Sequence, residues 1–216
     1  MKREKAEKIR GGSIMPFCVA ITGASGSGKT LLADALRKNI GVDNSFILEQ
    51  DRYYFGLPKG IDPFQYNFDS PDKIDWEKME EDLNTWRHRA EISAPKYDFI
   101  SHTRYGEEKI AYKDVLIIEG TLLLTNEKLR PYIDLSVFLD IPPDICLVRR
   151  IQRDIQERGR DIYEVINRYI RFVRPIYYKY ILPSKRHAEI IIAEQFNLTE
   201  ACCCIAQEIN KSKLVI

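Results

Sequence analysis

Residues 23–30 read GASGSGKT and directly follow the apolar run FCVAIT at residues 17–22. This stretch fits the pattern G-x-x-x-x-G-K-[ST], whose small residues let successive backbone N–H groups turn inward and bind phosphate oxygens. The helical sequence LLADALRKNI follows at residues 31–40, and a helix amino terminus adds a partial positive charge at the same place. A strand, a glycine-rich loop and a helix in this order predict a nucleotide-binding site.

Two side chains at the end of this loop carry the expected chemistry. Lys29 is expected to reach the β- and γ-phosphates, and the hydroxyl of Thr30 is expected to bind Mg²⁺. The alternative is a flexible strand-to-helix turn, but a chance match in a chain of this size is on the order of a per cent, and the flanking elements lower it further. The predicted nucleotide-binding residues are Gly23, Ala24, Ser25, Gly26, Ser27, Gly28, Lys29 and Thr30.

Four more short runs have the composition of buried strands, at residues 45–50, 115–120, 135–140 and 189–194. Each is rich in apolar or β-branched residues and lacks strict alternation, as expected of strands that are covered on both faces. Together with residues 17–22, these runs predict five strands of one parallel sheet.

Helical patterns lie between these runs, at residues 74–90 and 144–157. Strands that alternate with helices predict an α/β fold of the P-loop NTPase type, in which a parallel five-stranded sheet has helices on both faces. Residues 53–71 are rich in Gly, Pro and aromatic side chains without a period, so we expect a long functional loop. We expect residues 1–15 to be a flexible tail and residues 16–216 to form a single domain.

The composition is that of an ordinary globular protein and excludes several classes of function. The chain has 216 residues, with 33 lysines and arginines against 32 acidic residues, so it lacks the positive charge of a dedicated nucleic-acid binder. Its richest apolar run, residues 115–124, carries Glu119 and is too short to cross a bilayer. The first ten residues lack the apolar stretch of a secretory signal, and five cysteines, an odd number, argue against a disulfide framework. We therefore expect a cytoplasmic protein that binds neither nucleic acid nor a membrane.

Carboxylates follow two of the expected strands, at the edge where open α/β sheets bind ligands. Asp51 follows the second run, where it could accept the proton of a substrate hydroxyl or hold the water shell of a metal; the alternative is a helix cap or an ordinary loop carboxylate. Glu119 ends the third run, where it fits a metal-shell role, because an unpaired buried charge would be costly. The predicted metal-binding residues are Thr30, Glu119 and Asp51.

Five arginines lie within residues 149–161, which read RRIQRDIQERGRD. A run of charge is more commonly a solvated helix face, but here a glycine interrupts the run and acids neutralise only part of it. Arginines that fold over triphosphate oxygens would stabilise a transferring phosphoryl group. This stretch is therefore predicted to be the lid of a kinase, which must exclude water and present a substrate hydroxyl.

From the phosphate loop to about residue 192, the chain resembles the uridine kinase family, which phosphorylates uridine and often cytidine at the 5′-hydroxyl. Many phosphate-loop enzymes share GASGSGKT, whereas YDFISHTR at residues 97–104 and RDIQERGRD at residues 153–161 are far more specific to this family. The resemblance implies Mg²⁺ as cofactor, ATP or GTP as phosphate donor, a substrate-binding excursion near residues 52–110, and a homotetramer.

The resemblance also implies roles for individual residues. Asp51 is similar to the general base for the 5′-hydroxyl, with Tyr54 lining the pocket, and Asp69 is similar to the acceptor of the ribose hydroxyls. Tyr97 and His102 are similar to the pair that meets the pyrimidine edge. The implied catalytic residues are Asp51, Lys29, Arg153 and Arg158, and the implied substrate-binding residues are Tyr54, Asp69, Tyr97, His102, Arg150, Arg160 and Arg168.

The chain departs from the family at three places. Arg168 stands where the family commonly has glutamine before a tyrosine. Glu189 stands at the aspartate position of the family's A-D-I-I, where the resemblance implies a nucleotide contact, and AEQFN at residues 193–197 replaces the family's PRG. Arg168 either reaches the base, where its donors would favour uridine over cytidine, or it turns outward or joins the lid.

Three alternatives to a uridine kinase stay open on the sequence alone. A kinase for another small alcohol, such as nicotinamide riboside, pantothenate or ribulose 5-phosphate, would share the fold, although YDFISHTR argues against it. A nucleotide-gated switch protein would carry the guanine-reading sequence N-K-x-D, which is missing. A non-catalytic binding module would not need Lys29, Asp51 and the arginines together.

Overall fold

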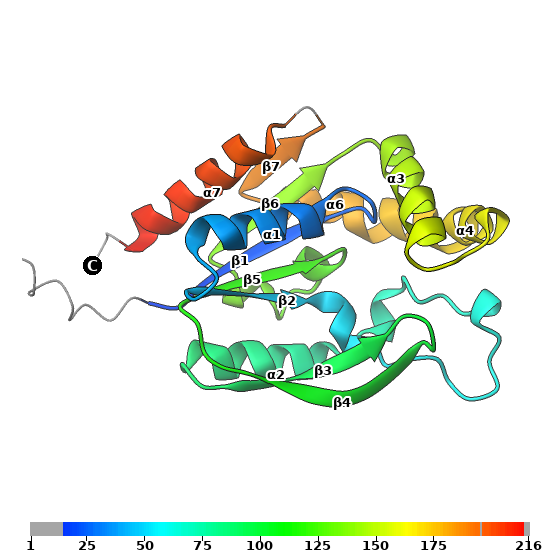
Figure 1. Cartoon of the computed structure of the whole chain (residues 1–216), viewed down its shortest axis with the longest axis horizontal. Coiled ribbons are helices and arrows are strands. Elements are labelled where there is room, and N and C mark those ends of the chain that lie inside the picture. The colour runs from blue at the N-terminus through cyan, green and yellow to red at the C-terminus, as the bar shows by residue number, and fades with distance from the viewer. Residues whose placement is uncertain (1–14, 195, 214–216) are drawn as a thin grey trace, which may run out of the picture.

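The computed structural model describes residues 15–194 and 196–213, so nearly all of the predicted tail at residues 1–15 lies outside the described residues. The main sheet has five parallel strands in the order β2-β5-β1-β6-β7. In the view of Figure 1, α1 and α7 lie above this sheet and α2 lies below it. The predicted parallel five-stranded sheet with helices on both faces is confirmed.

All five predicted strands form, with ends that differ from the prediction by a residue or so. The central strand β1 is buried along its whole length because it lies between β5 and β6 and is covered on both faces. The strands of this sheet are β1 Phe17–Gly23, β2 Ser45–Glu49, β5 Val115–Gly120, β6 Leu135–Asp140 and β7 Ile190–Ala193.

The helices predicted from periodicity also form, but only α2 buries the face that its three- and four-residue apolar spacing predicts; in α3 the buried residues are Cys146, Arg150 and Asp154. In α2, Met79, Leu83 and Trp86 are buried, and Asp75 caps the helix by accepting a hydrogen bond from the Lys78 amide at 3.0 Å. The helices are α1 Lys29–Ile40, α2 Trp76–Arg87, α3 Pro143–Gln156, α4 Ile162–Arg168, α5 Arg174–Ile176, α6 Leu182–Ser184 and α7 Leu198–Lys213.

The run from α4 to α6 is helical throughout and was not predicted. It contains two widened turns, at Tyr169–Val173 and Tyr177–Ile181, directly before α5 and α6. Pro175 and Pro183 account for them, because proline has no N–H to donate and its ring collides with the carbonyl one turn earlier. The chain accommodates each proline by a wider turn instead of ending the helix.

Parallel pairing brings the carboxyl ends of the central strands to one edge of the sheet. Glu49 of β2 pairs with Glu119 of β5, and Gly23 of β1 pairs with Leu139 of β6. The loops that follow these strands therefore open at the same edge, where ligands bind in sheets of this type.

The segment between β2 and β5 contains a hairpin that was not predicted. Its strands, β3 (Ile92–Asp98) and β4 (Thr103–Ile110), are antiparallel, and their register shifts between Pro95 and Tyr97. Because β3 contains a proline and β4 is polar and mostly exposed, neither has the sequence pattern of a buried strand. The hairpin matters for function because it carries Tyr97, and its turn carries His102.

The predicted long loop forms between the helical turns that end at Tyr53 and begin at Pro71, with a β-bridge from Tyr54 to Ile74 and a short helical turn at Pro63–Gln65. The predicted lid, residues 149–161, comprises the end of α3 and the turn that leads into α4. Within the two described ranges, no helix combines the length and the apolar character that a bilayer span requires.

Candidate active site

The phosphate loop joins β1 to α1 and requires glycine at two positions for different reasons. Gly28 directly precedes α1 with a φ of 100°, a left-handed conformation that side chains rarely adopt. Gly26 has a φ of 86°, and a Cβ there would collide with the carbonyl oxygen of Cys146 in α3. The loop therefore lies against the backbone of the helix that leads into the lid.

Lys29 is the first residue of α1 and lies near the buried carboxylates of Glu119 and Asp51. Its side chain is almost fully buried, and its Nζ donates to the carbonyl oxygen of Ala24 at 2.9 Å. Burial lowers the pKa of Lys29, while the nearby Glu119 and Asp51 act to raise it. The loop's own carbonyl holds the ammonium group at the phosphate site, so the group can exchange that partner for phosphate oxygens when a nucleotide enters.

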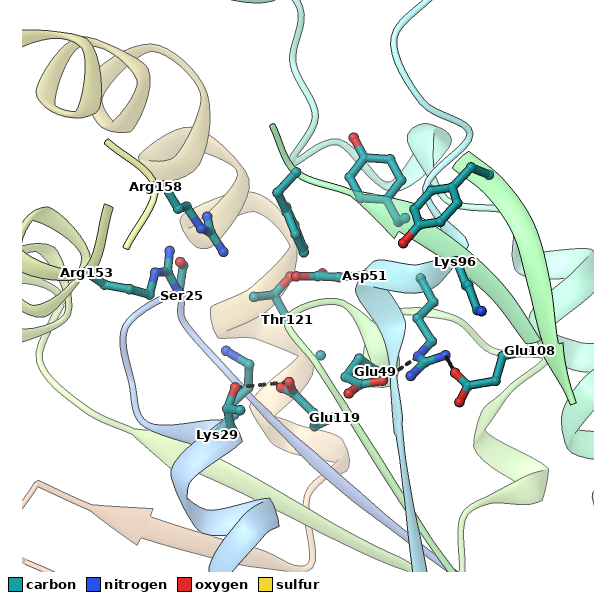
Figure 2. Close-up of a pocket in the computed structure, with 16 residues that line it drawn as sticks. Ser25, Lys29, Glu49, Asp51, Lys96, Glu108, Glu119, Thr121, Arg153 and Arg158 are labelled. Carbon is teal, nitrogen blue, oxygen red and sulfur yellow. Dashed lines mark hydrogen bonds and ion pairs between the residues drawn. The ribbon is translucent and has the colours of Figure 1, made fainter. Parts of the chain in front are cut away.

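Glu119 ends β5 and meets the first turn of α1. Its Oε1 accepts a hydrogen bond from the hydroxyl of Thr30 at 3.0 Å (Figure 2). Burial raises the pKa of Glu119, and Lys29 opposes this shift. Gly120 must follow, because a Cβ there would collide with the side chain of Gln50. This close approach packs β5 against the turn that holds Asp51.

Asp51 lies in a single helical turn, Gln50–Tyr53, immediately after β2. Gln50 fixes the turn because its Oε1 accepts a hydrogen bond from the Leu122 amide at 2.8 Å. Burial raises the pKa of Asp51, and the positive charges of Lys29 and Arg158 oppose the shift. A carboxylate with a raised pKa is a stronger base than an exposed one, which suits the removal of a proton from a hydroxyl.

The oxygen atoms at this edge fit a magnesium ion. Thr30, Glu49, Asp51 and Glu119 line one cavity of about 510 Å³. Burial disfavours the negative charge of Asp51 and Glu119, and a divalent cation would relieve that cost. Within the described residues, no three His, Cys, Asp or Glu side chains form a metal-binding group by themselves. Mg²⁺ in nucleotide enzymes is typically held through one or two carboxylates together with substrate phosphates.

A second cavity of about 80 Å³ shares Asp51 with the first. Asp51 therefore lies where a phosphate chain in the first cavity would meet a small molecule in the second. The structure brings together in the walls of this second cavity all seven residues predicted to bind substrate, namely Tyr54, Asp69, Tyr97, His102, Arg150, Arg160 and Arg168.

Aromatic rings form much of the wall of the second cavity. The ring centroids of Tyr54 and Tyr97 lie 5.3 Å apart, and Phe68 stacks on His102 with centroids 4.5 Å apart and planes inclined by 21°. His102 occupies the hairpin turn with a φ of 55°, and burial, aided by three nearby arginines and opposed by Asp98, lowers its pKa. A neutral imidazole can both donate and accept a hydrogen bond, which suits the edge of a planar base.

Four arginines of the predicted lid converge on the two cavities. Arg153 and Arg158 line both of them, and Figure 2 shows their guanidinium groups near Ser25 of the phosphate loop. Arg150 is buried, and its Nη1 lies 3.8 Å from Oδ1 of Asp69. Arg150 and Arg160 line the second cavity and not the first. The lid thus supplies positive charge on the phosphate side and on the substrate side.

Arg168, at the end of α4, anchors the loop that precedes Asp69. It is only 5% exposed, and its Nη1 donates to the carbonyl oxygen of Pro63 at 2.8 Å. Its Nη2 lies 3.4 Å from the carbonyl oxygen of Tyr66, and its guanidinium carbon lies 5.3 Å from the ring centroid of Phe68. The expectation that Arg168 turns outward is therefore wrong, because its side chain is buried and two of its nitrogens donate to backbone carbonyls, while its Nε has no hydrogen-bond partner among the described residues.

Glu189 does not lie beside the phosphate loop, contrary to the prediction that it contacts the nucleotide. It directly precedes β7, and its Oε2 accepts hydrogen bonds from the amide and the hydroxyl of Ser136 at 2.7 and 3.0 Å. Ser136 pairs with Ala20, three residues before the end of β1 at Gly23. The carboxylate therefore binds the amino-terminal half of β6 and holds the edge strand in register.

Three wall residues were not predicted: Phe68, Phe99 and Thr121 line the second cavity. The guanidinium carbon of Arg158 lies 4.7 Å from the ring centroid of Phe99, within cation–π range. Phe68 and Phe99 belong to NFDSPD at residues 67–72 and to YDFISHTR, so their motifs were the available signal.

The ion pairs that connect the turn of Asp51 to the hairpin β3–β4 were also not predicted. Arg52, next to Asp51, donates to Glu49 at 2.6 Å and to Glu108 of β4 at 2.7 Å (Figure 2). Arg104 of β4 pairs with Asp75 before α2 at 2.7 Å. No sequence pattern marks the pairs Arg52–Glu108 and Arg104–Asp75, because their partners are far apart along the chain.

A phosphate loop, a buried carboxylate and an adjoining small-molecule cavity lined by arginines define a phosphate-loop kinase that acts on a small molecule. Residues 18–198 match the family described as phosphoribulokinase / uridine kinase. The chain belongs to this family.

Relatives named uridine kinase cover most of the chain. The uridine kinase of Lactobacillus helveticus is 41% identical over 184 residues, which are 83% of this chain and 87% of that protein. The uridine kinase of Proteus mirabilis is 40% identical over 181 residues, which are 81% of this chain and 85% of that protein. The fold is similar to that of phosphoribulokinase from Rhodobacter spheroides, with a TM-score of 0.61 and 13% identity, over 87% of this chain and 74% of that one. This last likeness shows the fold alone.

Proposed function

We propose that this chain is a nucleoside kinase that transfers the γ-phosphate of ATP to the 5′-hydroxyl of uridine, with cytidine as a second acceptor. The observation that carries the proposal is the position of Asp51, which lines both the phosphate cavity and the adjoining cavity with its aromatic walls. The names of the relatives at about 40% identity support the choice of nucleoside.

In this reaction the phosphate loop and Lys29 bind the phosphates, and the carboxylate of Asp51 accepts the proton of the 5′-hydroxyl as the oxygen attacks. Tyr97 and His102 orient the base, and Asp69 accepts hydrogen bonds from the ribose hydroxyls. Arg153 and Arg158 stabilise the charge on the transferring group. A magnesium ion held near Thr30 and Glu119 would neutralise phosphate charge. We also propose that the reaction uses Mg²⁺ and that ATP is a better phosphate donor than GTP.

The test is a panel of acceptors incubated with ATP and Mg²⁺, with the phosphorylated product measured by chromatography. The panel contains uridine, cytidine, adenosine, nicotinamide riboside, pantothenate and ribulose 5-phosphate. We expect UMP to form with the highest kcat/KM, and parallel assays with GTP compare the two donors. Transfer to another acceptor in preference to both pyrimidine nucleosides would contradict the proposal.

Asp69→Ala is expected to impair uridine much more than 2′-deoxyuridine. The carboxylate loses partners that only the ribose cis-diol supplies, and hydrogen bonds to a charged group are worth about 1.5–3 kcal/mol, or roughly 10- to 100-fold in kcat/KM. The measurement is kcat/KM for both nucleosides in the parent and the variant. Equal losses for the two sugars would remove Asp69 from ribose recognition.

Arg168→Gln is expected to raise KM for uridine and cytidine by about the same factor, of the order of tenfold, because the loop before Asp69 loses its charged anchor. Since Nη1 and Nη2 of Arg168 are bonded to the carbonyls of Pro63 and Tyr66, the ratio of kcat/KM between the two nucleosides should change little. Both nucleosides are assayed with parent and variant. A uridine preference in the parent that shrinks in the variant would show instead that Arg168 reads the base.

The remaining expectations from the resemblance concern assembly and location. We expect a homotetramer, which sedimentation velocity of the full chain would measure, and a cytoplasmic protein whose partners are small molecules. A monomer at micromolar concentration would contradict the first expectation.

A further inference from the structure

One acidic residue of the predicted lid has no role in the chemistry described above, and yet it contacts three arginines of the same segment. Asp154 lies in the last turns of α3, and its side chain is completely buried. Burial of a carboxylate costs free energy unless cations lie beside it, so the cations around Asp154 identify its partners.

The three arginines approach Asp154 from different positions of the lid. Arg153 donates from Nε and Nη2 to Oδ1 at 2.9 and 2.8 Å, and Nη1 of Arg158 lies 3.2 Å from the same oxygen. Nε of Arg150 lies 3.5 Å from the other oxygen, Oδ2. The backbone carbonyl of Asp154 also accepts the amide of Arg160 at 3.0 Å. One carboxylate therefore bonds to Arg153, pairs with Arg158 and lies within ion-pair distance of Arg150, although Nε of Arg150 and Oδ2 of Asp154 form no hydrogen bond within the described part of the chain.

These contacts leave the arginines able to bind a ligand. A guanidinium has five N–H donors, and the bonds to Asp154 use only one edge of Arg153 and one nitrogen of Arg158. The same two side chains line the phosphate cavity, where Figure 2 shows their guanidinium groups near Ser25. They are thus held in place from behind while they face the phosphate site.

Without a central anion, these arginines would repel one another. Arg153 lowers the pKa of Arg158 after the larger effect of burial, and Asp154 acts in the opposite direction. Catalysis by fixed charge depends on groups that are already oriented when the transition state forms, since reorientation during the reaction costs free energy.

We propose that Asp154 is a positioning residue that holds Arg150, Arg153 and Arg158 in their working arrangement before the nucleotide binds. The proposal rests on the kinase activity proposed above but not on the identity of the acceptor. The competing explanation is that Asp154 only stabilises the end of α3, in which case its charge would affect stability and not turnover.

The test compares Asp154→Asn, which keeps the shape of the side chain and removes its charge, with Asp154→Glu and with Glu157→Gln. Glu157 is an exposed acid three residues further along the chain, so it serves as the matched control for charge. We expect Asp154→Asn to lower kcat by roughly 10- to 100-fold, somewhat less than the loss of a transition-state donor outright. KM for ATP and for the acceptor should change less than kcat. Asp154→Glu should recover part of the loss, and Glu157→Gln should match the parent.

A folded Asp154→Asn variant with parental kcat, or with a change confined to KM, would overturn the proposal. The comparison is made with whichever acceptor the parent phosphorylates, so a failure of the uridine assignment would appear in the parent and not in the ratio. A second measurement depends neither on activity nor on whether Asp154→Asn folds. In the ¹⁵N-arginine-labelled parent without nucleotide, the Nε–H of Arg153, assigned with Arg153→Lys, should exchange slowly with water. Exchange as fast as that of a free side chain would also overturn the proposal.

Discussion

Lys29→Ala is expected to abolish nearly all phosphoryl transfer in a protein that stays folded, with kcat reduced by about 10³-fold or more. The ammonium group is buried at the phosphate loop, within reach of the loop carbonyl of Ala24. Its charge matters most where negative charge redistributes on the transferring group, and at a buried site water cannot replace it. Initial rates with saturating ATP, Mg²⁺ and uridine measure the effect.

Lys38→Ala is the matched control, because Lys38 is an exposed lysine in the last turn of the same helix. Its removal tests whether the loss of any positive charge from α1 impairs the reaction. Circular dichroism and thermal melting establish that both variants fold. Near-normal turnover in folded Lys29→Ala would remove the assignment of residues 23–30 as the phosphate site.

Asp51→Asn is expected to lower kcat by about 10²- to 10⁴-fold, the usual contribution of general base catalysis, and to change KM for uridine far less. The amide keeps the shape of the carboxylate but cannot accept the proton of the 5′-hydroxyl. Steady-state kinetics separate the two parameters, and Asp43→Asn, at an exposed loop position, is the control. A variant changed only in KM would make Asp51 a binding residue.

The pH dependence gives an independent test of the same role. Burial raises the pKa of Asp51, so the free carboxylate gains its proton at a higher pH than an exposed aspartate does. Because only the deprotonated form can act as a base, kcat/KM should fall as pH falls through that raised pKa. The fall should disappear from the residual activity of Asp51→Asn. An identical acid limb in parent and variant would assign it to another group, with Glu119 as the first candidate, since burial raises its pKa as well.

Much of the fold could be predicted because it rests on local patterns. The loop GASGSGKT constrains the backbone strongly, and the apolar runs of β1, β5 and β6 are strands that the core covers on both faces, whereas the edge strand β7 is partly exposed. The hairpin β3–β4 escaped prediction because it lies outside the main sheet, where β4 is mostly exposed and needs no apolar pattern. The helix from α4 to α6 escaped because two prolines, which normally end helices, are accommodated by wider turns.

The residues of the candidate site also differ in how far local sequence patterns could predict them. Motifs identified Lys29, Thr30 and Asp51 directly, since each stands at a fixed distance from the loop or from the end of a strand. The predicted nucleotide contact of Glu189 was wrong because a position in a motif does not say at which end of a strand the side chain lies. Here the carboxylate accepts hydrogen bonds from Ser136 in β6. Arg168 could be recognised as unusual from its neighbours in sequence, but not as an anchor for carbonyls about a hundred residues earlier.

The sequence by itself determined that this chain has a phosphate loop, a parallel sheet and the residue types of a kinase, because those features depend on short-range spacing and on the exclusion of water from apolar runs. Tertiary structure alone decided the order of the strands, the meeting of the two cavities at Asp51 and the gathering of three arginines around Asp154. The physical reason is that a buried charge is tolerable only beside its partners. Those partners come from segments that only the folded chain brings together.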